Sequence, residues 1–192
     1  MNSNILSIIA FLGVASAAPH MQTRSTIAAY EQFGLTALRS GAAVHQQPFQ
    51  AYNGGILAGS AAQNASCDLG VDSAIAAFYL SDDGSMNLYS TDAPTQTTFV
   101  DASGMGQGVF QFTTGAQPMS NNGQRSNFTL DASNDLTFNG AGFLACPYLS
   151  NSWSIWVDTG AANPAGHTDC VGIVVRATKL DNAVSCQYTS SS

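Results

Sequence analysis

The stretch from Gly142 to Gly160, GFLACPYLSNSWSIWVDTG, constrains the fold most, because its apolar residues alternate with the period of two that a half-buried strand requires. Trp153, Ile155 and Val157 fall on one face of such a strand, and Trp156 falls on the other. A short apolar run before them ends at a proline, which cannot donate to a strand ladder. We therefore expect two strands joined by a polar turn, with a disulfide-bonded cysteine on the first.

The rest of the chain repeats this pattern in pieces of about five residues separated by turn residues. Asn53-Gly54 and Asp83-Gly84 are hairpin signals, the first between 49–51 and 56–58, the second between 76–80 and 86–89. Further strands are expected at 97–100, 109–113, 127–131, 136–139, 173–177 and 184–188. The pattern is typical of an antiparallel sandwich or barrel. We predict a single all-β domain, an antiparallel β-sandwich of the jelly-roll or Greek-key type with two disulfides.

The first residues have the composition of a secretory signal peptide. An apolar run over 5–14 leads to the small residues Ala15-Ser16-Ala17, and the run is too short to span a bilayer. We expect residues 1–17 to be a signal peptide, 18–34 a flexible leader and 35–189 the folded domain of a secreted protein. Because no second long apolar segment follows, we expect no membrane anchor.

Charged residues are few and mostly acidic. The chain has 5 Lys and Arg against 12 Asp and Glu, a formal net charge of −7. Nucleic acids and anionic membranes are therefore unfavourable partners.

Four cysteines, Cys67, Cys146, Cys170 and Cys186, predict two disulfides in a secreted chain, and their spacing allows three pairings. None of the spacings is typical of a zinc site. The sequons Asn64-Ala65-Ser66 and Asn127-Phe128-Thr129 predict N-glycosylation. The alternative to glycosylation is an unused sequon on a buried strand, and this alternative is stronger for Asn127 than for Asn64.

No catalytic residue, metal site or cofactor is predicted. His45 is interpreted as a strand residue and His167 as a surface-loop residue, and no GxSxG motif is present. The acidic turns at 82–84 and 131–135 are calcium candidates, but they lack EF-hand spacing, and ordinary turn chemistry is the favoured interpretation.

One alternative is a copper-dependent polysaccharide oxidase. Trimming of Ala18-Pro19 after signal cleavage would make His20 the N-terminal residue, and an N-terminal histidine can chelate copper together with a second histidine.

A second alternative is a carbohydrate-binding module or lectin. Aromatic rings stack on the apolar faces of sugars. Trp156 and Tyr148, with Tyr79 and Tyr89 as further candidates, are predicted to form such a platform. The competing interpretation is that these rings pack in the core, as we expect for Trp153.

The chain resembles the PhiA-type fungal cell-wall proteins, secreted proteins of phialide and conidium development, some of them IgE-binding allergens. The resemblance covers 33–189 and rests on four ordered segments: 38–48 from Leu-Arg-Ser to Pro, 78–84 (FYLSDDG), 142–147 (GFLACP) with Trp153 beyond, and 168–172 (TDCVG) followed by 187–189 (QYT).

The resemblance implies a non-enzymatic wall protein that acts in asexual development and stress protection, with wall polysaccharide or other wall glycoproteins as partners. It brings no catalytic residues. It also implies a disulfide pairing. In the family pattern two cysteines lie close together near the position of Cys67, and the last strand carries none. Here only Cys67 is present near that position, and Cys186 lies in the last expected strand. The resemblance therefore implies that Cys146–Cys170 is the disulfide shared with the family and that Cys67–Cys186 replaces the family's local one.

Overall fold

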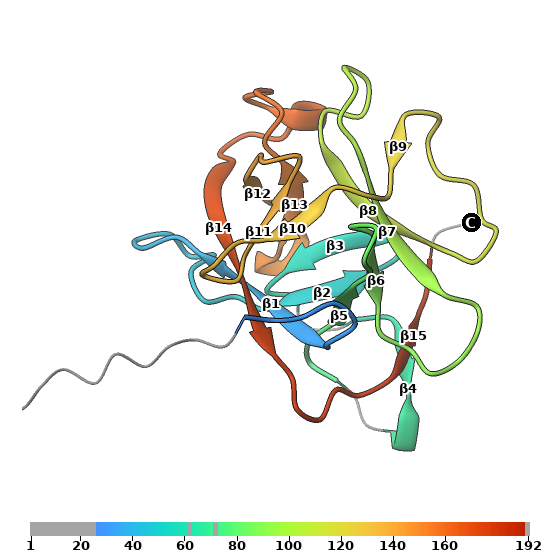
Figure 1. Cartoon of the computed structure of the whole chain (residues 1–192). Coiled ribbons are helices and arrows are strands. Elements are labelled where there is room, and N and C mark those ends of the chain that lie inside the picture. The colour runs from blue at the N-terminus through green and yellow to red at the C-terminus, as the bar shows by residue number, and fades with distance from the viewer. Residues whose placement is uncertain (1–25, 61–62, 71–72, 191–192) are drawn as a thin grey trace, which may run out of the picture.

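The computed structural model describes residues 26–60, 63–70 and 73–190 (Figure 1). The predicted signal peptide and residues 18–25 of the predicted leader, which include His20, lie outside these residues. The strands are β1 Phe33–Leu38, β2 Phe49–Tyr52, β3 Gly55–Ala58, β4 Ala65–Cys67, β5 Ala77–Leu80, β6 Met86–Leu88, β7 Gln96–Asp101, β8 Val109–Thr114, β9 Gly123–Gln124, β10 Phe128–Leu130, β11 Asp135–Phe138, β12 Phe143–Pro147, β13 Trp153–Val157, β14 Val171–Lys179 and β15 Cys186–Tyr188. Three short 3₁₀ turns are η1 Asp68–Gly70, η2 Leu149–Asn151 and η3 Pro164–Gly166.

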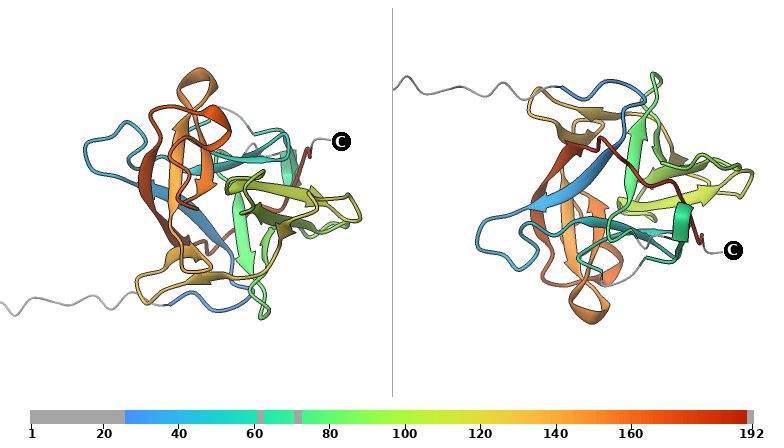
Figure 2. Two further views of the ribbon diagram at one scale, coloured as in Figure 1. Left: turned by 90° about the horizontal axis from the view of Figure 1, so that it is seen from above. Right: turned by 90° about the horizontal axis from the view of Figure 1, so that it is seen from below.

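Within the described residues, 9 strands close into an antiparallel barrel in the order β1-β5-β6-β7-β8-β3-β13-β12-β14, and β14 pairs back to β1. Figures 1 and 2 show these strands wrapped around a shared interior. The closing pair runs from Phe33 opposite Lys179 to Leu38 opposite Val174. The opposite edge of β14 is shared by β12, along its first residues, and by β11 further on.

The predicted β-sandwich is therefore wrong, although the all-β class and the two disulfides are confirmed. A sandwich and a barrel place the same alternating strands over a core. They differ in whether the first and last strands pair, and here β1 and β14 do. Closure also removes most of the unpaired strand edges that an open sheet would expose.

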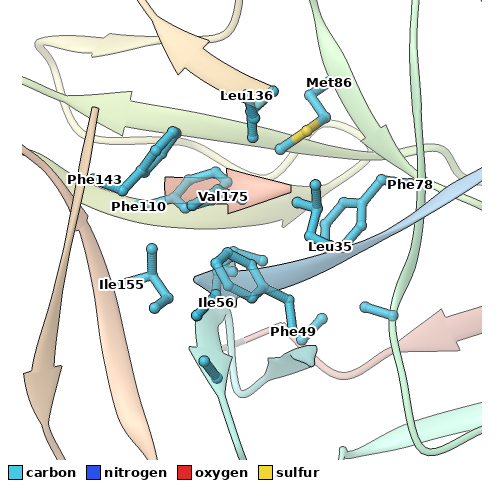
Figure 3. Close-up of a cluster of buried hydrophobic side chains, with 14 of the residues drawn as sticks. Leu35, Phe49, Ile56, Phe78, Met86, Phe110, Leu136, Phe143, Ile155 and Val175 are labelled. Atoms are coloured by element: carbon cyan, nitrogen blue, oxygen red, sulfur yellow. The ribbon is translucent and has the colours of Figure 1, made fainter. Parts of the chain in front are cut away.

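Phenylalanines are the most numerous of the largest fully buried side chains, and Figure 3 shows Phe49, Phe78, Phe110 and Phe143 packed with aliphatic side chains in part of the core. The Phe110 ring lies 5.6 Å from that of Phe128 and 5.9 Å from that of Phe143. These side chains come from β8, β10 and β12, so strands far apart in sequence share one aromatic cluster. Ile155 and Val157 join the core, as the alternation of β13 predicts.

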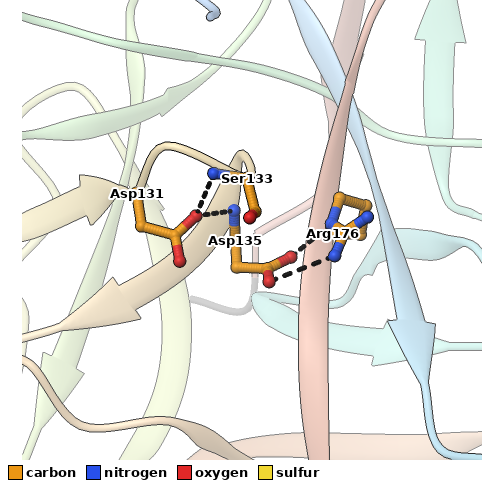
Figure 4. Close-up of polar contacts among 4 residues, drawn as sticks. All are labelled: Asp131, Ser133, Asp135 and Arg176. Carbon is orange, nitrogen blue, oxygen red and sulfur yellow. Dashed lines mark hydrogen bonds and ion pairs between the residues drawn. The ribbon is translucent and has the colours of Figure 1, made fainter. Parts of the chain in front are cut away.

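The β10–β11 hairpin extends from β14 to the β5–β6 turn, where the Phe128 N–H donates to the Gly84 carbonyl at 3.0 Å. Asp135 on β11 makes a two-pronged ion pair with Arg176 on β14 (Figure 4). One carboxylate oxygen of Asp131 accepts the N–H groups of Ser133 and Asp135 at 2.7 and 2.8 Å. This acidic turn, considered above for calcium, uses its carboxylates to shape the turn and to hold the hairpin on β14.

A second, two-stranded sheet of β4 and β15 lies below the barrel in Figure 1. Gln96 of β7 is buried and holds β15 by two hydrogen bonds to the backbone of Tyr188. Its amide oxygen accepts the Tyr188 N–H at 2.7 Å, and its amide nitrogen donates to the Tyr188 carbonyl at 2.6 Å. The Tyr188 hydroxyl accepts the N–H of Ala77 on β5 at 3.4 Å.

The barrel should lose stability in strong alkali because of Tyr188. Burial raises the pKa of its hydroxyl from 10.0 to about 12. The neutral form is therefore favoured in the folded state, and this contribution is complete below pH 10 and lost as the pH rises through 12. A pKa shift of about two units corresponds to about 3 kcal/mol of folding free energy. We expect urea unfolding at pH 9 to 12 to show this decline in wild type and a shallower one in Tyr188→Phe; parallel curves would contradict the assignment.

The chain contacts the barrel before the expected domain start at Leu35. The boundary lies inside β1, which begins at the buried Phe33. Upstream, the Ile27 N–H donates to the Asn134 side chain at 3.2 Å, and Glu31 pairs with Lys179. The last part of the predicted leader is thus attached to the β10–β11 turn and to β14.

Candidate functional site

A pocket of about 230 Å³ lies on the outer face of the barrel, where β3, β8 and β13 are neighbours. Antiparallel pairing places Ser154 opposite Leu57 and Trp156 opposite Val109, so these four side chains point to the same face. The intervening residues of β13 and β8, Ile155 and Phe110, point into the core. The pocket floor is therefore the outward half of the alternation in each strand.

Trp156 forms one wall of the pocket. Its ring is only 7% exposed, its indole N–H donates to the Ser154 hydroxyl at 2.9 Å, and the His167 ring lies 5.5 Å away. A loop covers Trp156 because Cys170 at its end is bonded to Cys146, and the Ala165 N–H donates to the Gln107 side chain at 2.6 Å. Trp156 is thus a wall residue held in one orientation rather than an open stacking platform.

Tyr148, which is 45% exposed, lines the same pocket from the end of β12. The structure therefore brings together Trp156 and Tyr148, the two residues predicted to form a platform. The further candidates lie elsewhere: Tyr79 faces Tyr30 at 6.2 Å, and the Tyr89 carbonyl accepts the Cys186 N–H at 3.2 Å.

The other lining residues did not enter the predicted platform; they include Tyr52, Asn53, Gln111 and His167. Tyr52 and Asn53 stand at the β2–β3 turn, and Gln111 occupies an outward position of β8. The sequence signals that could have identified them are the position of Tyr52 beside an Asn-Gly turn and the outward position of Gln111 in an alternating strand. His167 carried none, because its position depends on a disulfide and on the loop that the disulfide closes.

The described lining contains no Asp, Glu, Lys or Arg. It offers aromatic rings, side-chain amides of Asn53 and Gln111, and the hydroxyls of Ser154 and the tyrosines. Rings contact the C–H faces of a sugar, while amides and hydroxyls exchange hydrogen bonds with its hydroxyl groups. This combination suits a neutral, hydroxyl-rich ligand rather than an ion.

The two disulfides join Cys67 to Cys186 and Cys146 to Cys170, the pairs that the resemblance implied. The first connects β4 to β15, and the second connects β12 to the loop before β14.

Both sequon asparagines are exposed. Asn64 lies just before β4, and its side-chain N–H donates to the Asn53 side-chain oxygen at 2.8 Å. Asn127 lies just before β10 with a φ of 81°, and its carbonyl accepts the Asn139 N–H at 3.0 Å. Asn127 is therefore not on a buried strand.

The remaining polar candidates are used locally. The His45 ring nitrogen Nδ1 accepts the Arg39 N–H at 3.1 Å. Hydrogen bonds from the backbone N–H of Ser85, and then from its hydroxyl, hold the pKa of Asp83 below its usual value. Across the described ranges, no group of three or more His, Cys, Asp or Glu side chains is arranged to hold a metal ion. None of the helices in those ranges has the length and apolar character needed to span a bilayer.

Comparison with known proteins identifies the relatives of this chain. Residues 33–189 match the family described as PhiA-like secreted protein. The cell wall protein phiA of Aspergillus fumigatus is 50% identical over 158 residues, which cover 82% of this chain and 84% of the relative. The proteins of the same name from Emericella nidulans and Aspergillus niger are each 44% identical over 162 residues, covering 83% and 84% of this chain and 87% of each relative. No solved structure matches the chain.

These matches confirm the resemblance found in the sequence. The protein is secreted and located in the fungal cell wall. Because the family match covers residues 33–189 and half of the 158 positions aligned with the Aspergillus fumigatus protein are identical, the chain belongs to the PhiA-like secreted protein family.

Proposed function

We propose that this chain is a non-enzymatic structural protein of the fungal wall that acts in asexual development and stress protection and binds a neutral wall polysaccharide. The observation that carries the binding role is the uncharged pocket between Trp156 and Tyr148, with amides on its rim and floor. A carbohydrate-binding module of this kind needs no catalytic group. Its ligand would be a segment of neutral polymer whose sugar ring lies against the tyrosine and tryptophan side chains.

Several features support retention in the wall by binding. Few charges leave hydrogen bonding and ring contact as the means of attachment, and such contacts are less sensitive to salt than ion pairs. The pocket floor is built on three barrel strands, so its side chains are positioned by the fold itself and not by a free loop. Disulfides and N-glycans suit a protein that must persist outside the cell.

The binding role is tested by a pull-down of glycan-free protein with chitin, β-1,3-glucan and mannan at low and high salt. We expect saturable, salt-resistant retention on one polymer. Tyr148→Ala should weaken it about tenfold, since aromatic contacts contribute on the order of 1 kcal/mol or more. Tyr30→Ala is the matched control, because Tyr30 is similarly exposed (54%, against 45% for Tyr148) and lies outside the pocket lining. Absence of retention on all polymers, or equal losses in both variants, would refute the binding role.

The developmental role is tested by deleting the gene in the fungus that encodes it. We expect fewer phialides and conidia, and conidia that survive oxidative and wall stress less well, with both defects restored by the wild-type protein. Normal conidiation and stress survival in the deletion strain would count against this part of the proposal.

A further inference from the structure

We infer that an N-glycan on Asn64 lies at the mouth of the pocket and limits its access to external polysaccharide. The inference rests on the proposed binding function of that pocket. It concerns regulation of the site by a modification of the same chain.

Asn64 is placed for modification. Its side chain is exposed immediately before β4, and Ser66, the third residue of its sequon, is exposed as well. The modifying oligosaccharide is attached to the side-chain nitrogen Nδ2. The position of that atom therefore decides where the glycan begins.

Nδ2 of Asn64 lies 2.8 Å from Oδ1 of Asn53, which is a lining residue of the pocket. A glycosylated amide nitrogen retains one N–H, so the hydrogen bond to Asn53 is compatible with the modification. The first sugar is consequently attached one hydrogen bond away from the pocket rim. A single sugar unit is larger than that separation.

The attachment point is also fixed relative to the rim. The Thr189 N–H donates to the Asn64 carbonyl at 2.7 Å, and the Gly54 N–H donates to the Thr189 carbonyl at 3.2 Å. Thr189 therefore bridges Asn64 and the β2–β3 turn that carries Asn53. The Cys67–Cys186 disulfide links the two strands that flank this bridge.

An N-glycan consists of neutral sugars next to its attachment point, which is the ligand chemistry that the pocket lining favours. Because it is tethered, its effective concentration at the pocket is in the millimolar range. A single sugar unit held by a few contacts has a Kd of about the same order, so the tethered sugar would occupy the pocket about half of the time, and an external polymer would bind about twofold more weakly.

Asn127 is the control position for a glycan that lies away from the pocket. It carries the other sequon and is exposed, but it does not line the pocket and its backbone is bonded to Asn139. A glycan there starts beside β10. It should not affect the pocket.

The experiment compares the wild-type protein with Ser66→Ala and Thr129→Val, which remove one sequon each, and with the double variant. All are secreted from a glycosylating fungal host. Peptide mass spectrometry establishes the occupancy of Asn64 and Asn127, and binding isotherms are measured on the polymer that retains the glycan-free protein. Asn64→Gln serves as a second variant at the same site should Ser66→Ala fold poorly.

We expect Ser66→Ala to bind about twofold more tightly than wild type and Thr129→Val to bind as wild type does. An unmodified Asn64, or equal affinities for Ser66→Ala and Thr129→Val, would overturn the inference while leaving the proposed function intact. Failure of the glycan-free double variant to bind any polymer would overturn the proposed function, and the inference with it.

Discussion

Replacing Cys67 and Cys186 together by alanine should lower the free energy of unfolding by about 5 kcal/mol, against about 3.5 kcal/mol for the Cys146 and Cys170 pair. The difference follows from the loops that the disulfides close in the unfolded chain, since the two sequence separations are 119 and 24 residues. Five kcal/mol is comparable with the whole stability of many domains. The first variant should therefore be close to unfolding at room temperature.

Urea unfolding followed by circular dichroism measures both losses on one scale. The two pairs should also differ in function. The Cys146–Cys170 bond holds the loop that covers Trp156, so its removal should weaken polysaccharide binding beyond what its stability cost explains. A larger stability loss from the shorter loop, or unchanged binding without it, would contradict this division of roles.

Trp156→Ala should both destabilise the protein and abolish polysaccharide binding. The ring is 7% exposed and lies between the barrel face and His167, so truncation leaves a cavity and should cost about 3–5 kcal/mol. The same change removes one wall of the pocket. Thermal unfolding and the polymer pull-down give the two results independently.

Trp156→Phe separates the two effects. It keeps most of the ring volume and loses the N–H that donates to Ser154, so it should fold with a loss of about 1 kcal/mol and retain part of the binding. Full binding by a folded Trp156→Ala protein would exclude this pocket as the site.

Local signals in the sequence predicted the strands well. The Asn53-Gly54 and Asp83-Gly84 turns join β2 to β3 and β5 to β6, and the alternation of β13 places Ile155 in the core and Trp156 on the outer face. These features depend on residues close together in the chain. β1 was not predicted as a strand. The short β4 and β9 were not predicted either, since segments of two or three residues have too few positions to show alternation.

Closure of the sheet could not be predicted in the same way. It depends on pairing between β1 and β14, residues that lie at opposite ends of the domain, and period-two patterning contains no information about strand partners. The lining of the pocket could not be predicted fully for the same reason, because it depends on which strands are neighbours. Trp156 and Tyr148 are close in sequence and were considered together, whereas Tyr52, Gln111 and His167 reach them only through the barrel and the Cys146–Cys170 bond.

The most direct test of the account is an NMR titration of the two tryptophan indole N–H signals with short oligosaccharides of chitin, β-1,3-glucan and mannan. The chain has 2 tryptophans, of which Trp156 lines the pocket and Trp153 packs against the core. We predict that one oligosaccharide shifts the Trp156 signal saturably and leaves the Trp153 signal in place. No shift of the Trp156 signal with any of the three, at concentrations where the polymer retains the protein, would contradict the pocket as the site of wall binding.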